Sequence, residues 1–254
     1  SVKGDYVVSV GRDRSAKLTE LKTQRFMDNI TSITPGALAG GLASVVRHPE
    51  RDEILVGGAD GTPKIYRMHR TTARKIGDDA NLIRKFPKME GRVFSVDFSA
   101  DGKRIAAANS HDGTGTVAIY GIKFDSKMPG DIKKIFAKRV SQRSAEEQKK
   151  IAAYQVADVG PPLKADFSTP MYTVNFRPDG KVLAAAGYDG LIRLIDTISG
   201  KVTKEFMPVK IDKTAAEARA NEGTAAVLLE TDTTLKNKLP KGTKITALSV
   251  QPSQ

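Results

Sequence analysis

The sequence predicts an all-β protein in which short antiparallel sheets are repeated along the chain. Apolar and polar residues alternate with a period of two, which is typical of strands, in several short segments of the chain. Asp-Gly pairs separate several of these strands. Asp-Gly is a hairpin signal because Gly accepts positive φ and Asp hydrogen-bonds the neighbouring backbone. The recurrence of the same order of strands and turns predicts a repeat architecture.

Two copies of the repeat are closely similar. Residues 93–103, with the sequence VFSVDFSADGK, are echoed by residues 171–181, with the sequence MYTVNFRPDGK. Each copy continues into a strand of small apolar residues, a second Asp-Gly pair and an alternating strand. We therefore predict three consecutive antiparallel strands in each of two sheets, at 93–98, 104–108 and 116–120 and at 171–176, 182–186 and 191–195.

Two less regular copies come earlier in the chain. The first begins at residues 6–10, ends with 16–20 and lacks an opening strand. The second has its strands at 43–46, 54–56 and 64–66. The sequence thus contains four recognisable copies of one unit.

Repeated sheets of this size are expected to stack. Three or four short strands cannot bury both faces alone, so such units pack around an axis as the blades of a β-propeller. Small residues such as Ala106 and Ala184 suit inner strands, where neighbouring blades approach closely. A ring of seven blades needs about 300 residues at ~40–45 per repeat. We therefore expect an incomplete ring, unless degenerate blades lie at 83–86 or 132–140.

The repeat resembles that of the WD-repeat family. The last copy matches best, through FRPDGK at 176–181 and GYDGLIRLID at 187–196. The family's Trp-Asp ending is replaced here by Ile195-Asp196, the Gly-His opening is absent, and the chain has no Trp to complete the family's buried hydrogen-bond set. The resemblance implies a WD-type β-propeller that acts as a binding scaffold. It does not identify a partner, because this fold serves many tasks.

A second resemblance is narrower. Residues 31–38 and 47–58 are similar to the propeller region of large exported proteins of planctomycete-type bacteria. In that group the propeller is often joined to a cytochrome c domain and an Ig-like domain, and residues 244–252 resemble the first strand of such an Ig-like domain. The resemblance implies an exported, periplasmic protein near electron-transfer or polymer-degrading machinery, and a chain cut at both ends from something larger.

The repeat is interrupted at residues 125–168. An apolar face predicts a helix at 131–140, and the capping box formed by Ser144 and Glu147 predicts a second at 145–156. We expect a helical insertion packed on the propeller edge. The alternative is a docking arm for a partner, since long insertions often carry function.

These patterns divide the chain into three parts. Residues 1–208 are predicted to form the blades, with the insertion among them. Residues 209–243 are polar, rich in Ala, Thr, Lys and Glu, and predicted to form a linker. For residues 244–254, the resemblance described above implies the first strand of a following Ig-like domain.

Composition narrows the classes of function. The chain has no Cys, which excludes disulfides, a Cys nucleophile, thiolate zinc sites and haem attachment through C-x-x-C-H. No apolar run approaches the ~18 residues that span a bilayer. The net charge of +12 is explained first by solubility, and as a binding signal it favours acidic protein surfaces, anionic lipid or nucleic acid. Nucleic acid is the weaker alternative, because the basic residues are spread along the chain, most densely from Lys64 to Lys75, and aromatic residues are only 6%.

No pattern predicts catalysis, a cofactor or a metal. Ser110-His111-Asp112 holds the residue types of a hydrolase triad, but neighbours on a strand point apart. The histidines His48 and His69 lie on other repeats, and all three histidines are expected at the surface. Aspartates at equivalent turns of the repeats offer a cation-binding ring as an alternative to purely structural turns. We assign the following turn residues to structure: Asp13, Asp60, Gly61, Asp101, Gly102, Asp112, Gly113, Asp179, Gly180, Asp189 and Gly190.

The predicted function is a non-catalytic protein–protein interaction scaffold that contacts other subunits or other domains of its parent protein. Partners are expected at a rim formed by loops, without assigned residues. One alternative is an accessory domain of an enzyme whose catalytic or haem domain lies outside this chain. A second alternative is a basic propeller that binds nucleic acid.

Overall fold

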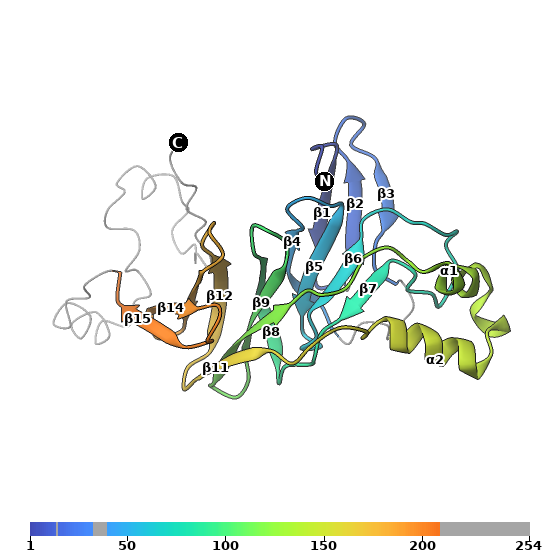
Figure 1. The fold of residues 1–254 in the computed structure, drawn as a ribbon. Coiled ribbons are helices and arrows are strands. Elements are labelled where there is room, and N and C mark those ends of the chain that lie inside the picture. Colours follow the sequence, from blue (N-terminus) through green and yellow to red (C-terminus); the bar gives the residue numbers. More distant parts are fainter. Residues whose placement is uncertain (14, 33–39, 209–254) are drawn as a thin grey trace. The chain divides into compact units, whose positions relative to one another are not determined.

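The computed structural model describes residues 1–13, 15–32 and 40–208 (Figure 1). These residues belong to one unit, Ser1–Pro208, defined by its internal contacts. The linker predicted at 209–243 and the Ig-like strand predicted at 244–254 lie outside the described residues. Within the described part, the chain forms four antiparallel sheets, which agrees with the predicted all-β class.

Each sheet takes its strands from one continuous stretch of chain, apart from the helical insertion. The first sheet contains β1 (Tyr6–Val10), β2 (Ala16–Glu20) and β3 (Phe26–Asn29). The second contains β4 (Leu42–Arg47), β5 (Glu53–Gly58), β6 (Lys64–Arg67) and β7 (Leu82–Lys85). The third contains β8 (Arg92–Phe98), β9 (Arg104–Ser110), β10 (Gly115–Gly121) and β11 (Leu163–Phe167). The fourth contains β12 (Met171–Phe176), β13 (Val182–Gly187), β14 (Ile192–Asp196) and β15 (Val202–Phe206).

The sheets follow one another through their first strands. β4 contacts β8, and β8 contacts β12. In the first sheet β1 contacts β4 and takes the place of a second strand, as predicted from its missing opening strand. The arrangement is that of successive propeller blades, with the first strand of each blade innermost.

The six strands predicted for the third and fourth sheets are confirmed. The fourth and outermost strand of each of these two sheets, β11 or β15, was not predicted. Residues 83–86, named above as a place for a degenerate blade, largely form β7 of the second sheet. The predicted insertion at 125–168 extends too far, because β11 pairs with β10 and completes the third sheet. Alternation requires one buried face, and β11 has no buried residue, which explains the missed boundary.

The insertion is helical, as predicted. It contains α1 (Gly130–Ala137), a single 3₁₀ turn (Val140–Gln142) and α2 (Ala145–Tyr154). The capping box is present, because Ser144 Oγ accepts from the amide of Glu147 at 3.2 Å and the Glu147 carboxylate accepts from the amide of Ser144 at 3.0 Å. Residues 132–137 belong to α1, Lys138 and Arg139 are extended, and Val140 begins the 3₁₀ turn, so no strand of an additional blade lies at 132–140.

The insertion leaves the third sheet and packs beside β7 of the second sheet (Figure 1). The amide of Lys85 donates to the carbonyl of Gln155 at 2.7 Å, and Arg84 Nε donates to the carbonyl of Ala157 at 2.9 Å. The Arg84 guanidinium also lies between two rings, 4.6 Å from Phe124 and 4.5 Å from Tyr154. The insertion thus covers the outer strand of the preceding blade.

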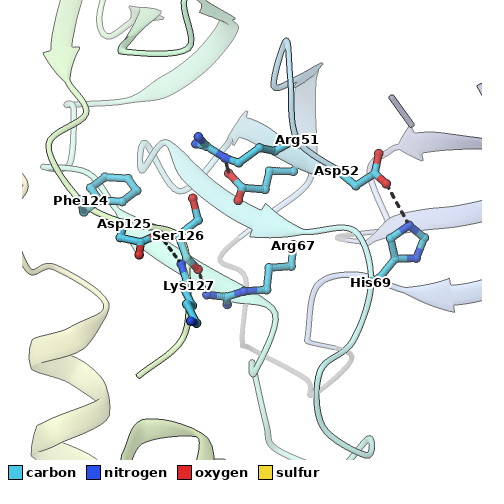
Figure 2. Close-up of a pocket in the computed structure, with 9 residues that line it drawn as sticks. Arg51, Asp52, Arg67, His69, Phe124, Asp125, Ser126 and Lys127 are labelled. Atoms are coloured by element: carbon cyan, nitrogen blue, oxygen red, sulfur yellow. Dashed lines mark hydrogen bonds and ion pairs between the residues drawn. The ribbon is translucent and has the colours of Figure 1, made fainter. Parts of the chain in front are cut away.

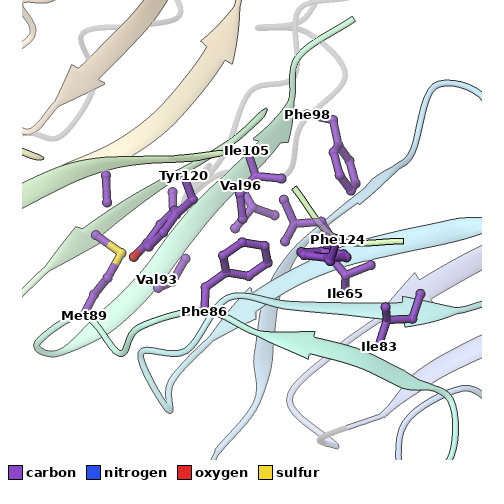
Figure 3. Packing of buried hydrophobic residues seen from close by; sticks show 13 residues of the cluster. Ile65, Ile83, Phe86, Met89, Val93, Val96, Phe98, Ile105, Tyr120 and Phe124 are labelled. Atoms are coloured by element: carbon purple, nitrogen blue, oxygen red, sulfur yellow. The ribbon is translucent and has the colours of Figure 1, made fainter. Parts of the chain in front are cut away.

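Apolar side chains fill the spaces between neighbouring sheets. Successive residues of a strand face opposite sides, so each sheet packs against the one before it and the one after it. Leu55 and Ile65 of the second sheet join the core shared with the third sheet, where Phe86 meets Tyr120 edge to face at 5.1 Å (Figure 3). The side chain of Ile54 faces the other way and packs towards the first sheet.

Candidate functional site

The connections between strands define two ends of each blade. Because the strands are antiparallel, the turn between the first and second strands and the connection between the third and fourth lie at one end. This is called the insertion end, since α1 and α2 belong to such a connection. The turn between the second and third strands and the link to the next sheet lie at the opposite end. The predicted turn residues are therefore divided between two ends.

Three aspartates at the opposite end have the same surroundings. Each carboxylate accepts a hydrogen bond from the amide two residues later, at 3.0 to 3.4 Å. Each also forms an ion pair with the basic side chain four residues later: Asp13–Lys17, Asp60–Lys64 and Asp189–Arg193. The hydrogen bond from Lys17 lowers the pKa of Asp13, and that from Arg193 lowers the pKa of Asp189. These carboxylates are neutralised within their own turns, and among the described residues no group of three acidic or histidine side chains is placed to hold a metal ion.

The fourth aspartate of this set lies in a different kind of turn. Asp112 has a positive φ of 44° and is followed by Gly113 with φ of 82°. Its carboxylate lies 3.5 Å from His111 Nε2, and the backbone of His111 pairs with that of Thr114 across the turn. The Ser110-His111-Asp112 sequence thus runs from the end of β9 into this tight turn.

The turns at the insertion end repeat a second motif. Asp101 and Asp179 each accept the amide two residues later at 3.0 Å, and the following Gly102 and Gly180 have φ of 64° and 68°. The hydrogen bond from Ser99 lowers the pKa of Asp101. The hydrogen bonds from the Arg177 guanidinium, helped by a backbone amide, lower the pKa of Asp179 to about 2.

His48 corrects the expectation that all three histidines lie at the surface. It is 1% exposed, and its Nδ1 accepts from the amides of Glu50 at 3.1 Å and Arg51 at 3.2 Å. The ring meets Phe98 edge to face at 5.0 Å and lies against Gly102. Burial, together with the charge of Arg51, lowers the pKa of His48. His48 therefore joins the second and third blades as a neutral packing group.

The basic stretch from Lys64 to Lys75 does not form one free patch. Arg70 and Arg74 both pair with Asp28, and Lys75 Nζ donates to the carbonyl of Phe136 at 2.8 Å. Lys64 pairs with Asp60. The partners of Arg70, Arg74 and Lys75 lie in other segments of the chain, so no local sequence pattern could reveal them.

A charged pocket of about 440 Å³ lies at the insertion end between the second and third blades (Figure 2). It is lined by residues from three segments of chain: Arg51, Asp52, Glu53, Arg67, His69, Phe124, Asp125, Ser126 and Lys127. Arg51 Nε approaches Glu53 Oε2 to 3.0 Å, without the alignment of a hydrogen bond. His69 Nε2 lies 3.6 Å from Asp52, whose other oxygen accepts from the amide of Val2 at 2.7 Å.

One face of the fourth sheet differs from its counterpart in the third. In the third sheet Ala106 pairs with Ile119, and Ala108 pairs with Val117. These four side chains are at most 4% exposed and pack against the fourth sheet. The same register in the fourth sheet pairs Ala184 with Leu194, and Ala186 with Ile192. Those four are only half-buried, and no further described sheet follows.

The four sheets are blades of the β-propeller class. Residues 80–117 and 163–196 match the model of the WD domain, G-beta repeat. These two segments of the chain thus carry repeats of the WD type. Each match begins at the outer strand of one blade, β7 or β11, and continues into the first three strands of the next, so the helices fall between the two matches. No match is found among curated proteins.

No helix within the described residues has the length and apolar character needed to cross a membrane. No sequence pattern predicted the charged pocket or the half-buried face. Arg67 and Ser126 are 59 residues apart and meet only through the packing of two blades. The half-buried face becomes visible only when equivalent positions of two blades are compared for burial.

Proposed function

We propose that this chain is a non-catalytic scaffold for protein–protein contacts, and that its fourth sheet docks a further sheet of the same kind. WD repeats generally act as interaction scaffolds, which supports the general class of function. We infer the position of the contact from the half-buried face of the fourth sheet, which consists of Ala184, Ala186, Ile192 and Leu194.

The argument rests on equivalence between blades. The third sheet presents Ala106 and Ile119 to the fourth, and both are buried there by contacts that include Val174 and Phe176. Leu194 is the counterpart of Ile119 in register. Burial of one apolar side chain of this size contributes ~1.5–3 kcal/mol, so a face of several such residues favours a partner.

The occupant that fits this face is another WD-type blade. The two alanines leave room for an inner strand at close range, as Ala106 and Ala108 do for β12. An incoming first strand with apolar residues at the positions of Met171, Val174 and Phe176 would repeat the contact already present between the third and fourth sheets. We assign this blade to the parent polypeptide.

Cysteine labelling tests the proposal directly, because the chain contains no Cys. Leu194→Cys would be introduced into residues 1–254 alone and into the full-length protein. We expect rapid maleimide labelling in the isolated chain and at least tenfold slower labelling in the full-length protein. Ala185→Cys, at a buried position, and Lys201→Cys, at an exposed one, set the slow and fast limits.

Equal labelling of Leu194→Cys in the two proteins would contradict the docking proposal. Protection already present in the isolated chain would also contradict it, since that result means the face is covered without a further blade. Slow labelling of Lys201→Cys in the full-length protein would show general shielding, and the docking assignment would then fail.

The exported setting is also a proposal, supported by the sequence resemblance alone. We propose that the scaffold works in the periplasm beside electron-transfer or polymer-degrading machinery. A C-x-x-C-H motif and a secretory signal in the full-length gene are expected. A gene lacking both would contradict this setting and would also weaken the alternative of an accessory domain beside a haem domain.

A further inference from the structure

We propose that the charged pocket at the insertion end binds a carboxylate, supplied by an acidic side chain of a protein partner. The pocket lies between the second and third blades, away from the half-buried face of the fourth sheet. Its central group is Arg67, whose side chain runs towards Ser126 and Lys127 (Figure 2).

Arg67 differs from the other buried cationic side chains of the described residues. Lys64, Arg143 and Arg193 each pair with a carboxylate. Arg84 lies between two aromatic rings, which offset part of its charge. Arg67 is only 9% exposed, yet it forms no ion pair with any described acidic residue. A buried charge without a counterion is costly, so this pocket favours an anion.

The hydrogen bonds of Arg67 satisfy only one of the two terminal nitrogens of its guanidinium. Nη2 donates to the carbonyl of Ser126 and to Tyr154 Oη at 2.8 Å. Nη1 is buried and has no hydrogen-bond partner among the described residues. Glu53 lies opposite Arg67 in the strand register, but its carboxylate pairs with Arg51. Nη1 is therefore the donor that a bound carboxylate would satisfy.

The charged side chains that line the pocket favour a carboxylate over phosphate. Lys127 lines the pocket, is exposed, and makes no ion pair within the described part of the chain, so its ammonium can reach a ligand. Asp52, Glu53 and Asp125 also line the pocket and oppose a high negative charge. A carboxylate carries one negative charge, whereas phosphate carries nearly two at neutral pH. The pocket therefore favours the carboxylate.

Peptide titration followed by NMR tests this site on the protein as it exists. The probe is acetyl-Gly-Glu-Gly-amide, and acetyl-Gly-Gln-Gly-amide is its uncharged counterpart. We expect saturable shifts of the Arg67 side-chain Nε–H and of the Ser126 and Lys127 amides with the Glu peptide, and at least tenfold weaker binding of the Gln peptide. Inorganic phosphate is expected to bind no more tightly than the Glu peptide.

Two matched variants separate this pocket from general surface charge. Lys127→Ala removes a lining ammonium, and Lys123→Ala removes an exposed ammonium that does not line the pocket. We expect Lys127→Ala to weaken binding of the Glu peptide about threefold to tenfold and Lys123→Ala to leave it unchanged. Arg67→Met is expected to abolish binding of the Glu peptide. Thermal melting checks that this variant remains folded.

Three results would overturn the proposal. They are equal binding of the Gln and Glu peptides, equal weakening by Lys123→Ala and Lys127→Ala, and tighter binding of phosphate than of the Glu peptide. If Arg67→Met fails to fold, the Lys127→Ala and Lys123→Ala comparison still decides the matter, because both positions are exposed.

Discussion

Asp78 and Arg143 form a buried two-pronged ion pair, with nitrogen–oxygen distances of 3.0 and 2.9 Å. Asp78 precedes β7 of the second blade, and Arg143 lies between the 3₁₀ turn and α2 of the insertion. Arg143 also donates to the carbonyls of Ile135 and Lys138, at 3.2 and 3.0 Å. One side chain thus joins the two helices to each other and to the neighbouring blade.

Removing Arg143 should destabilise the insertion. Arg143→Met leaves the Asp78 carboxylate buried without a partner, and loss of one member of a buried pair costs ~3–5 kcal/mol. The double variant Asp78→Asn with Arg143→Met should recover part of that loss, because the uncompensated charge is removed. Chemical denaturation and hydrogen exchange of α1 and α2 measure both effects. Lys138→Ala, which removes only an exposed ion pair with Glu147, should cost much less. Equal losses for Arg143→Met and Lys138→Ala would contradict the assigned role.

Two glycines in comparable turns should respond differently to substitution. Gly190 has φ of 74°, and a Cβ there meets nothing within 4 Å. Gly190→Ala should cost ~1–2 kcal/mol through its left-handed backbone alone, and Gly190→Val ~1–3 kcal/mol. Gly102 has φ of 64°, but its Cβ would lie 2.4 Å from His48 Nε2. Gly102→Ala should therefore lose a further ~1–3 kcal/mol through overpacking. Melting temperatures of the two alanine variants compare the sites, and a larger loss at Gly190 would reverse the expected order.

Asp79 should lower stability above about pH 6. Burial raises its pKa to about 6, partly offset by a hydrogen bond from Tyr66 at 3.2 Å and by the charge of Lys64. Because the folded pKa exceeds the unfolded value of 3.8, the folded protein binds more protons between these values, and stability is lost as pH rises through about 6. Asp79→Asn should therefore gain stability relative to the parent at pH 7.5, and much less at pH 4.5. Melting of the parent and of Asp79→Asn at both pH values measures this gain. An equal gain at pH 7.5 and pH 4.5 would contradict the raised pKa of Asp79.

His48 should lower the stability of the folded protein as pH falls, whereas Asp79 lowers it as pH rises. Burial is the main cause that lowers the pKa of His48 below the ordinary histidine value of 6.5. The unfolded chain therefore binds a proton that the folded protein does not, and stability falls as pH drops below about 6.5. Comparison of the parent with His48→Gln between pH 7.5 and 5.5 isolates this effect. The stability of the variant should depend less on pH, and an equal or steeper dependence would contradict the buried neutral ring.

The inner strands were predictable because their signals are local. The Asp-Gly turns at Asp101 and Asp179 fix where β8 and β12 end, and alternation identifies the strands that follow. The outer strands gave weaker signals. β15 has the sequence VTKEF with every residue exposed, and β11 lies directly after a helical insertion that hides its place in the repeat.

The candidate sites were less predictable because they depend on contacts between blades. Arg67 was identified only as one charge in a basic stretch. Its lack of an ion pair depends on the pairing of the neighbouring Glu53 with Arg51. The burial of His48 likewise depends on Phe98 and Gly102, which belong to the next blade. No pattern within a single repeat contains this information.

The helical cover on β7 has a consequence for solubility. An open strand edge presents free amides and carbonyls that can template pairing with another chain and begin aggregation. The bond from Lys85 to Gln155 occupies part of that edge on the second blade. The outer strand of the fourth blade has no such cover among the described elements and instead carries the charged residues Lys204 and Glu205. The two blades thus resist edge-to-edge association by different means, one through a covering insertion and the other through charge.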